Sequence, residues 1–202
     1  MLKAAIAVLF LLAVATPAAS VDAELNEIRD HFTLGGKPVP PEIFVDFGNG
    51  DPLESAKSVR VALDLRAAVG STLYADPVTV SGDGWISQRK KASQEGEAIS
   101  YKFSGATRNG LIVVLSSFYG GGTGRYATLH ILDVAEAHAF ESDGKLYGRL
   151  NLTQLRAVPL GDRWRGRITI AGDTISVVTE AGEPNNGNTE PTTQRIEAIR
   201  PD

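Results

Sequence analysis

The segment Gly120-Gly121-Gly122-Thr123-Gly124 has the composition of an anion-binding loop. The backbone N–H groups of such a glycine run can surround a phosphate. The run lacks the Lys-Ser/Thr ending of a P-loop, and Arg125 stands where a dinucleotide-binding fingerprint needs its last glycine. We therefore interpret the run as a tight connection between strands, where glycine adopts positive φ angles at no steric cost. A nest for an anion is the alternative.

Arginine alternates with other residues at 163–167, within the C-terminal third of the chain. Arg163, Arg165 and Arg167 are separated by Trp164 and Gly166. Alternate residues of a strand point to the same face of a sheet, so we expect one basic face with Trp164 at its edge. Guanidinium groups bind carboxylates through two parallel hydrogen bonds, which predicts a site for an acidic polymer or a carboxylate. The alternative is a solvated face paired with nearby acidic residues.

Residues suited to metal binding or acid–base catalysis show no recognised spacing. A strand would place His130 and Asp133 on opposite faces. Ser116 and Ser117 lie close to the glycine run but lack the Gly-x-Ser-x-Gly pattern of a nucleophile elbow. A dispersed triad depends on geometry alone and stays open. The sequence therefore predicts no catalytic residue, no metal site and no cofactor.

The elements that would position these residues are mainly strands. Leu25, Ile28 and Phe32 lie at helical spacing and predict one helix over 23–32, with Asp22 as its cap. Prolines that follow prevent its continuation. Apolar alternation or continuous apolar runs predict strands near 59–64, 85–87, 99–103, 111–115, 125–134, 145–152, 163–170, 174–178 and 194–199.

The close spacing of these strands predicts an all-β fold. We expect mainly an antiparallel sandwich or a partly open barrel, with one short N-terminal helix. The continuously apolar run 111–115 predicts a central strand buried on both faces. Asp143-Gly144 and Gly172-Asp173 predict hairpin turns. We expect residues 21–202 to form a single β-rich domain, with a flexible loop at 182–193.

The first 20 residues have the three parts of a secretory signal peptide. Lys3 precedes an apolar run at 4–15, and small residues follow it. The run is shorter than the roughly 20 residues that a membrane span needs. We predict cleavage after Ala18, Ser20 or Ala23, which would release a periplasmic or secreted protein.

Charge and cysteine content narrow the partners. Twenty Lys and Arg against 24 Asp and Glu give a formal net charge of -4, which argues against a nucleic-acid partner. The chain has no cysteine, so we expect neither disulfides nor a lipid anchor on a cysteine behind the signal. No later stretch is apolar for long enough to predict a membrane span in the mature chain.

Several short segments together resemble a group of exported, uncharacterised bacterial proteins. They are FTLGGKPVPP at 32–41, SYK at 100–102, NG at 109–110, the glycine run at 120–124, and PLGDR at 159–163 followed by Gly166. The resemblance covers most of the predicted mature chain, in order. It implies export and no particular activity.

These observations lead to three hypotheses. The first is a non-catalytic exported domain that binds an envelope component or a protein partner through the arginines at 163, 165 and 167. The second is a small hydrolase acting on cell-wall or extracellular substrate, with its site near the glycine run. The third is an inhibitor of an envelope-degrading enzyme, with the loop at 182–193 as the inhibitory segment.

Overall fold

The computed structural model of the protein describes residues 20–47, 61–70, 77–89, 96–181 and 190–200. Its helices are α1 (Val21–His31), α2 (Ile43–Asp46) and α3 (Leu65–Gly70). Its strands are β1 (Thr33–Leu34), β2 (Lys37–Pro38), β3 (Ala62–Asp64), β4 (Thr79–Val80), β5 (Trp85–Arg89), β6 (Ala98–Ala106), β7 (Ile112–Tyr119), β8 (Tyr126–Phe140), β9 (Leu146–Asp162), β10 (Gly166–Ala171), β11 (Thr174–Thr179) and β12 (Thr192–Glu197).

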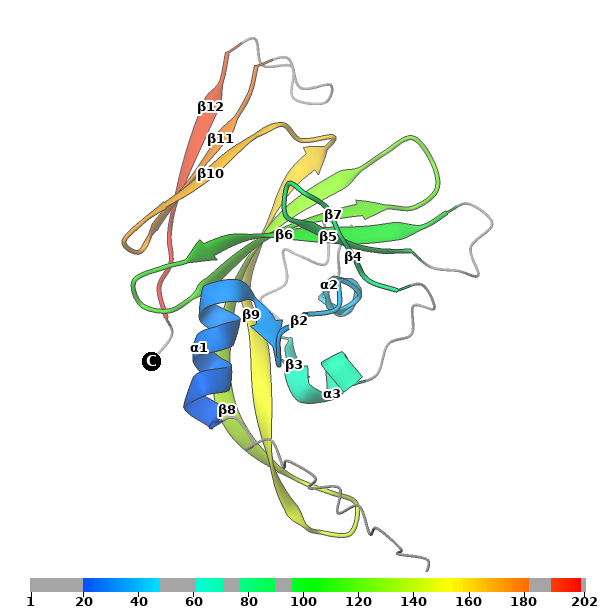
Figure 1. Cartoon of the computed structure of the whole chain (residues 1–202). Coiled ribbons are helices and arrows are strands. Elements are labelled where there is room, and N and C mark those ends of the chain that lie inside the picture. Colours follow the sequence, from blue (N-terminus) through cyan, green and yellow to red (C-terminus); the bar gives the residue numbers. More distant parts are fainter. Residues whose placement is uncertain (1–19, 48–60, 71–76, 90–95, 182–189, 201–202) are drawn as a thin grey trace, which may run out of the picture.

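Two antiparallel sheets form the body of the molecule, and β1 and β2 pair as a separate two-stranded ribbon (Figure 1). The larger sheet has seven strands in the order β3-β9-β8-β7-β6-β5-β4, and the smaller has the order β10-β11-β12. The predicted fold class is therefore confirmed, with the N-terminal helix in place. The short helices α2 and α3 were not predicted.

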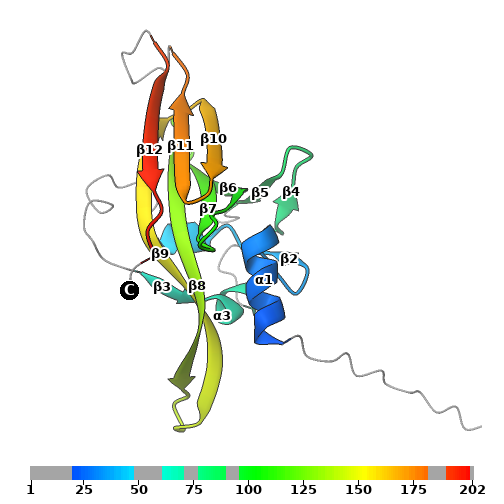
Figure 2. The ribbon, with the colours of Figure 1, turned by 90° about the vertical axis from the view of Figure 1, so that its left-hand side faces the viewer.

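Each face of the seven-stranded sheet has its own core. On one face, Ile112 and Val114 of β7 pack with residues of the three helices and of the β1–β2 ribbon. On the other face, Leu111 and Val113 pack with Ile175, Ile196 and other residues of the three-stranded sheet. Figures 1 and 2 show the helices and the small sheet on opposite sides of the large one. The prediction of a central strand buried on both faces is confirmed.

Helix α1 begins at a different cap from the one we predicted. Ser20, not Asp22, is the N-cap: its hydroxyl oxygen accepts a hydrogen bond from the Ala23 N–H at 3.3 Å. Asp22 lies in the first turn, where a carboxylate is favourable near the positive end of the helix dipole. The helix ends at Phe32, whose φ of 53° is left-handed and whose buried ring packs into the first core.

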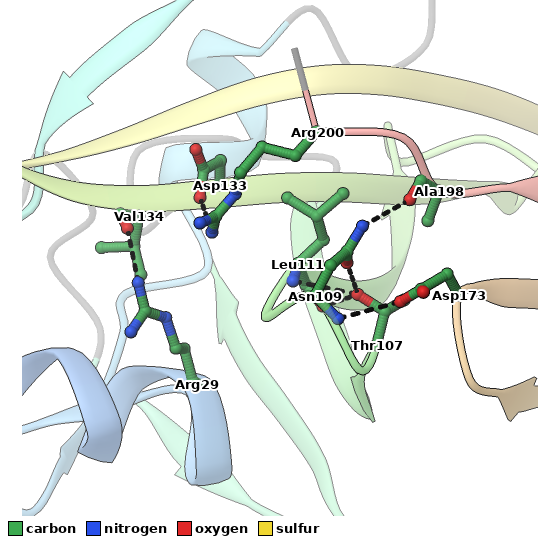
Figure 3. Close-up of polar contacts among 9 residues, drawn as sticks. All are labelled: Arg29, Thr107, Asn109, Leu111, Asp133, Val134, Asp173, Ala198 and Arg200. Atoms are coloured by element: carbon green, nitrogen blue, oxygen red, sulfur yellow. Dashed lines mark hydrogen bonds and ion pairs between the residues drawn. The ribbon is translucent and has the colours of Figure 1, made fainter. Parts of the chain in front are cut away.

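The turn between β6 and β7 fastens the small sheet to the large one (Figure 3). The Asn109 side chain donates to the Ala198 carbonyl at 2.7 Å, and its backbone N–H donates to Asp173 Oδ1 at 2.9 Å. Thr107 closes the turn, because its hydroxyl oxygen accepts from the Leu111 N–H at 3.0 Å. These contacts hold the β10–β11 turn and the C-terminal segment against the seven-stranded sheet.

The β8–β9 hairpin extends well beyond the rest of the sheet as a two-stranded arm (Figures 1 and 2). Phe140 is paired with Leu146 at its tip, and the Glu141 N–H donates to the Lys145 carbonyl at 2.8 Å. Gly144, with a φ of 84°, supplies the left-handed residue that the turn needs. The hairpin predicted at Asp143-Gly144 is confirmed.

Several strand boundaries differ from the sequence prediction; β8, for example, ends at Phe140 and not near 134. β10 begins at Gly166, three residues later than we expected, because Arg163 adopts a left-handed φ of 52° in a turn. β9 continues to Asp162, well past the predicted end at 152. The signal peptide, apart from Ser20, and most of the predicted loop, residues 182–189, lie outside the described residues.

Candidate functional site

Four hydroxyl side chains form a row across the strands at one end of the large sheet. Thr79 is paired with Ser87, Ser87 with Ser100, and Ser100 with Ser117. The row therefore crosses β4, β5, β6 and β7 at one level, over a length of about 14 Å at the usual spacing of strands. It lies on the face opposite buried Tyr101, and so opposite the helices.

This row lines a hollow of about 490 Å³. The hollow also contains Arg89, Tyr119 and Arg125. Arg89 and Tyr119 lie one level along from the hydroxyls, since Ala98 is paired with both of them. The small sheet lies on the same face of the large sheet, but it packs mainly over β7, β8 and β9, so the hollow lies beside it.

The charge of the hollow differs from that of the whole chain. Among its described lining residues there is no Asp or Glu, whereas the chain as a whole carries a net charge of -4. Arg89 and Arg125 are exposed, and neither forms an ion pair within the described part of the chain. The Arg125 guanidinium lies over the Tyr119 ring, 5.5 Å from its centroid. Two guanidinium groups without an ion pair therefore face the same hollow. The Asp162 carboxylate accepts a hydrogen bond from the Arg125 backbone N–H at 2.6 Å, but its ion pair is with Arg163.

Two hydroxyls of the row are free to bind a ligand. Ser100 donates to the Ser117 carbonyl and Thr79 to the Ser87 carbonyl, each at 3.3 Å. The hydroxyls of Ser87 and Ser117 are half-buried and have no hydrogen-bond partner within the described residues. A half-buried hydroxyl can donate and accept at once, so these two can bind the oxygens of a polar ligand.

The glycine run at 120–124 connects β7 to β8 at the border of this hollow. Gly121 has a φ of 92° and its carbonyl accepts a hydrogen bond from the Tyr119 hydroxyl at 3.1 Å. The interpretation of the run as a strand connection with positive φ is confirmed. The connection places Tyr119 and Arg125 side by side, because Tyr119 is the last residue before the run and Arg125 is the first residue after it.

The arginines predicted to form one basic face lie in three different settings. Arg163, in its left-handed turn, pairs with Asp162 at 3.1 Å. Arg165 precedes β10, and its carbonyl accepts from the Glu180 N–H at 3.0 Å. Arg167 is exposed within β10, on the outer side of the small sheet, because its neighbour Ile168 faces the core. The continuous strand predicted through 163–167 was wrong, because Arg163 is left-handed and β10 begins only at Gly166. That the three arginines form one binding face stays a prediction.

Trp164 has a structural role in this segment. Its indole N–H donates to the Thr179 hydroxyl at 2.9 Å, and its ring packs against the second core. Gly166 is required beside it, since a Cβ there would lie 2.6 Å from the indole and 2.0 Å from the Val178 carbonyl oxygen. Arg163 remains close to the hollow, because its N–H donates to the Arg125 carbonyl at 2.6 Å.

A Ser–His pair lies on the other face of the same strands. Ser116 Oγ is 2.8 Å from His130 Nε2, and His130 Nδ1 is 2.6 Å from Gln154 Oε1. The Gln154 amide donates to the Phe47 carbonyl at 3.4 Å, which orients its oxygen toward the imidazole. His130 Nδ1 is therefore the donor, and the Ser116 hydroxyl can donate to Nε2.

This Ser–His pair is enclosed. Ser116 and His130 are each 1% exposed, and the His130 ring lies 4.8 Å from the Phe44 ring, centroid to centroid. Burial lowers the pKa of His130 to about 4, so the imidazole is neutral at neutral pH. The arrangement has the order of a hydrolase triad with a glutamine in the third position, but the hollow lies on the opposite face.

The sequence analysis did not predict the hollow, but it singled out the glycine run at 120–124 and Arg163, which lie beside it. Arg89 and Arg125 were not singled out, because their proximity depends on the pairing of four strands. The signal available was the alternation in β5 and β6, which places Ser87 with Arg89 and Ser100 with Lys102 on shared faces. Within the described part of the chain, no three His, Asp or Glu residues gather as metal ligands, and no helix is long and apolar enough to span a membrane.

Comparisons with known proteins gave no matching family model, no matching curated protein and no matching solved structure. The resemblance to exported bacterial proteins therefore stays a prediction, and the candidate site is argued from its geometry.

Proposed function

We propose that the protein is an exported, non-catalytic binding domain whose hollow takes an anionic group of an envelope component. The observation that carries this proposal is the pair Arg89 and Arg125, without an ion pair in a hollow that has no described acidic lining residue. An unpaired guanidinium attracts carboxylate and phosphate groups and binds them through two parallel hydrogen bonds.

The remaining walls suit an oxygen-rich ligand. Ser87 and Ser117 offer hydroxyls, and Tyr119 offers part of a ring beside them. A volume of about 490 Å³ lies within the usual range of roughly 300–1,000 Å³ for small-ligand sites. The ligand that fits best is therefore one or two units of an acidic saccharide or a polyol phosphate, both of which occur as parts of larger envelope polymers.

The experiment measures binding of defined anions by calorimetry. An oligosaccharide of uronic acids, the same oligosaccharide as its neutral methyl ester, and a glycerol phosphate oligomer are compared. We expect binding of at least one anionic probe and none of the ester. Arg89→Ala with Arg125→Ala should weaken that binding at least tenfold, since each guanidinium contact to an anion is worth about 1.5–3 kcal/mol.

A matched control uses the arginines of the original hypothesis. Arg163→Ala, Arg165→Ala and Arg167→Ala together remove more positive charge than the double variant but leave the hollow intact. We expect the triple variant to retain affinity within about threefold. If the triple variant lost binding and the double variant did not, the segment at 163–167 would be the binding surface and the assignment of the hollow would be wrong.

Hydrolysis is less well supported than binding. Ser116 and His130 have the contact that a nucleophile and its base require, but both lie in the core and face away from the hollow. Gln154 would not stabilise an imidazolium as a carboxylate does. Ser116→Ala should therefore leave ligand binding unchanged, and turnover of the bound probe that disappears in this variant would favour the hydrolase hypothesis instead.

The compartment is part of the proposal. Its support is the leader, Lys3 followed by the apolar run at 4–15. Fractionation should find the shortened protein outside the cytoplasm. N-terminal sequencing should show cleavage after Ala18, because that position retains Ser20 as the cap of α1. A full-length product among cytosolic proteins would contradict the proposed location and leave the anion-binding test unaffected.

A further inference from the structure

The arm formed by the far ends of β8 and β9 has one partly covered edge and one open edge. On the β9 side, β3 pairs with 151–153, and the Arg66 guanidinium donates to the Gly148 carbonyl at 2.9 Å. On the β8 side, β7 stops opposite Leu132. Beyond it, Arg200 pairs with Asp133 and Arg29 donates to the Val134 carbonyl, as Figure 3 shows.

The open edge therefore runs along 135–140. No strand or side chain in the described part of the chain pairs with this edge of the backbone. An unpaired strand edge readily accepts another strand, and proteins usually protect it with charged residues, above all lysine, with proline or with a bulge. Residues 135–140 contain one charged residue, Glu136, and no lysine or proline, and their pairing with β9 is regular.

The sequence of this edge is complementary to itself. It reads Val134-Ala135-Glu136-Ala137-His138-Ala139-Phe140. Antiparallel pairing with a second copy, centred on Ala137, would place Glu136 opposite His138 of the second copy on both sides of the centre. A carboxylate and an imidazole N–H form a hydrogen bond, or an ion pair when the imidazole is protonated. Opposite charges directly across two strands stabilise the pairing.

The two faces of such a pairing are also compatible. Glu136 and His138 are exposed and lie on the face that carries Val134, whereas Ala135, Ala137 and Ala139 lie on the other face. Alanine would then meet alanine on that face, with no side chain large enough to clash. Phe140, 73% exposed at the tip, would reach the base of the partner's arm and lose contact with water.

We propose that two copies of this chain associate through their arms by antiparallel pairing of the β8 edges about Ala137. The chain has no cysteine, so introduced cysteines report this register directly. Directly opposed residues of antiparallel strands have Cα atoms about 4.5–5.5 Å apart, a separation that a disulfide can bridge.

The first experiment is oxidative cross-linking of the full chain. Ala137→Cys should give at least tenfold more disulfide dimer than Ala139→Cys, because residue 139 would face residue 135. A mixture of Ala135→Cys and Ala139→Cys should form the mixed dimer. Equal cross-linking of Ala137→Cys and Ala139→Cys, or none in either, would overturn the proposal.

The second experiment measures the dimer dissociation constant by sedimentation. Glu136→His and His138→Glu should each weaken association at least tenfold, because like groups would then face each other. The combined exchange should restore it to within threefold. Glu141→His, a matched change in the turn outside the paired stretch, should have no effect. The register would be overturned if the wild-type protein stayed monomeric or if the single variants had no effect. It would also be overturned if the combined exchange failed to restore association.

Discussion

Ser116 and Ser117 are adjacent in β7 but lie in opposite environments. Ser116 is 1% exposed and contacts His130 in the core beneath the helices. Ser117 is half-buried and lines the hollow on the other face, with no partner for its hydroxyl in the described structure. Two neighbouring residues of one strand thus belong to different polar groups. Ser116 has hydrogen-bond partners in the core, whereas the Ser117 hydroxyl has none in the described structure.

The difference shows what each polar group contributes. Ser116, His130 and Gln154 form a hydrogen-bonded chain that also includes the Thr128 and Phe47 carbonyls. A buried polar group requires such partners, because losing one costs about 1–3 kcal/mol. Their contribution is to the stability of the sheet and to the position of α2, through the Phe47 carbonyl. Ser117 and the arginines of the hollow contribute little to folding and keep their bonding capacity for a ligand.

Among the variants that test this difference between the two faces of β7, His130→Ala should have the largest effect on stability. The variant removes a buried ring that packs against Phe44 and leaves Ser116 and Gln154 without their shared partner. We expect the free energy of unfolding to fall by about 4 kcal/mol. Denaturant titration measures it. A loss below about 1 kcal/mol would contradict the structural role, and the folded fraction should still bind the anionic probe.

Measuring stability as a function of pH tests the same hydrogen-bond network without the cavity that His130→Ala creates. The pKa of His130 is lowered from 6.5 to about 4 by burial, so the unfolded state binds a proton that the folded state does not. Stability should therefore be complete above pH 6.5 and decrease as pH falls toward about 4, by about 3 kcal/mol from this group. His130→Gln should flatten this part of the profile. Exposed His31 and His138 are present in both proteins and cancel.

A smaller effect is expected from Ser116→Ala, which removes one hydroxyl and leaves the ring. His130 Nε2 then loses its donor in a site closed to water. We expect a loss of about 1–2 kcal/mol in unfolding free energy, together with unchanged affinity for the anionic probe. Affinity that fell with Ser116→Ala would mean that the two faces of β7 are coupled.

The sequence was sufficient for the class of fold and for several of its turns. The strands and the turn at Asp143-Gly144 are determined by residues close together in the sequence. Both could therefore be predicted from short stretches of it. The end of β9 could not, because Arg163 turns left-handed in contact with Asp162 and Arg125. Periodicity alone does not report such long-range contacts.

The candidate sites were harder to predict for a related reason. His130 and Gln154 are 24 positions apart and meet only because β8 pairs with β9 in one register. Arg89 and Arg125 share a hollow only because four strands lie in one order. Alternation predicted which residues of a single strand share a face, but the identity of the neighbouring strand decided which charges meet.

The smallest expected change in stability is that of Ser117→Ala, the matched partner of Ser116→Ala. Its hydroxyl bonds to nothing in the described structure, so unfolding free energy should change by less than about 0.5 kcal/mol. Affinity for the anionic probe should fall by about threefold, because the ligand loses one neutral hydrogen bond and keeps both guanidinium contacts. Calorimetry and denaturant titration of the same preparation provide both values. If Ser117→Ala destabilised the protein as much as Ser116→Ala, the hydroxyl row would belong to the fold, and the hollow would have to bind its ligand through Arg89 and Arg125 alone.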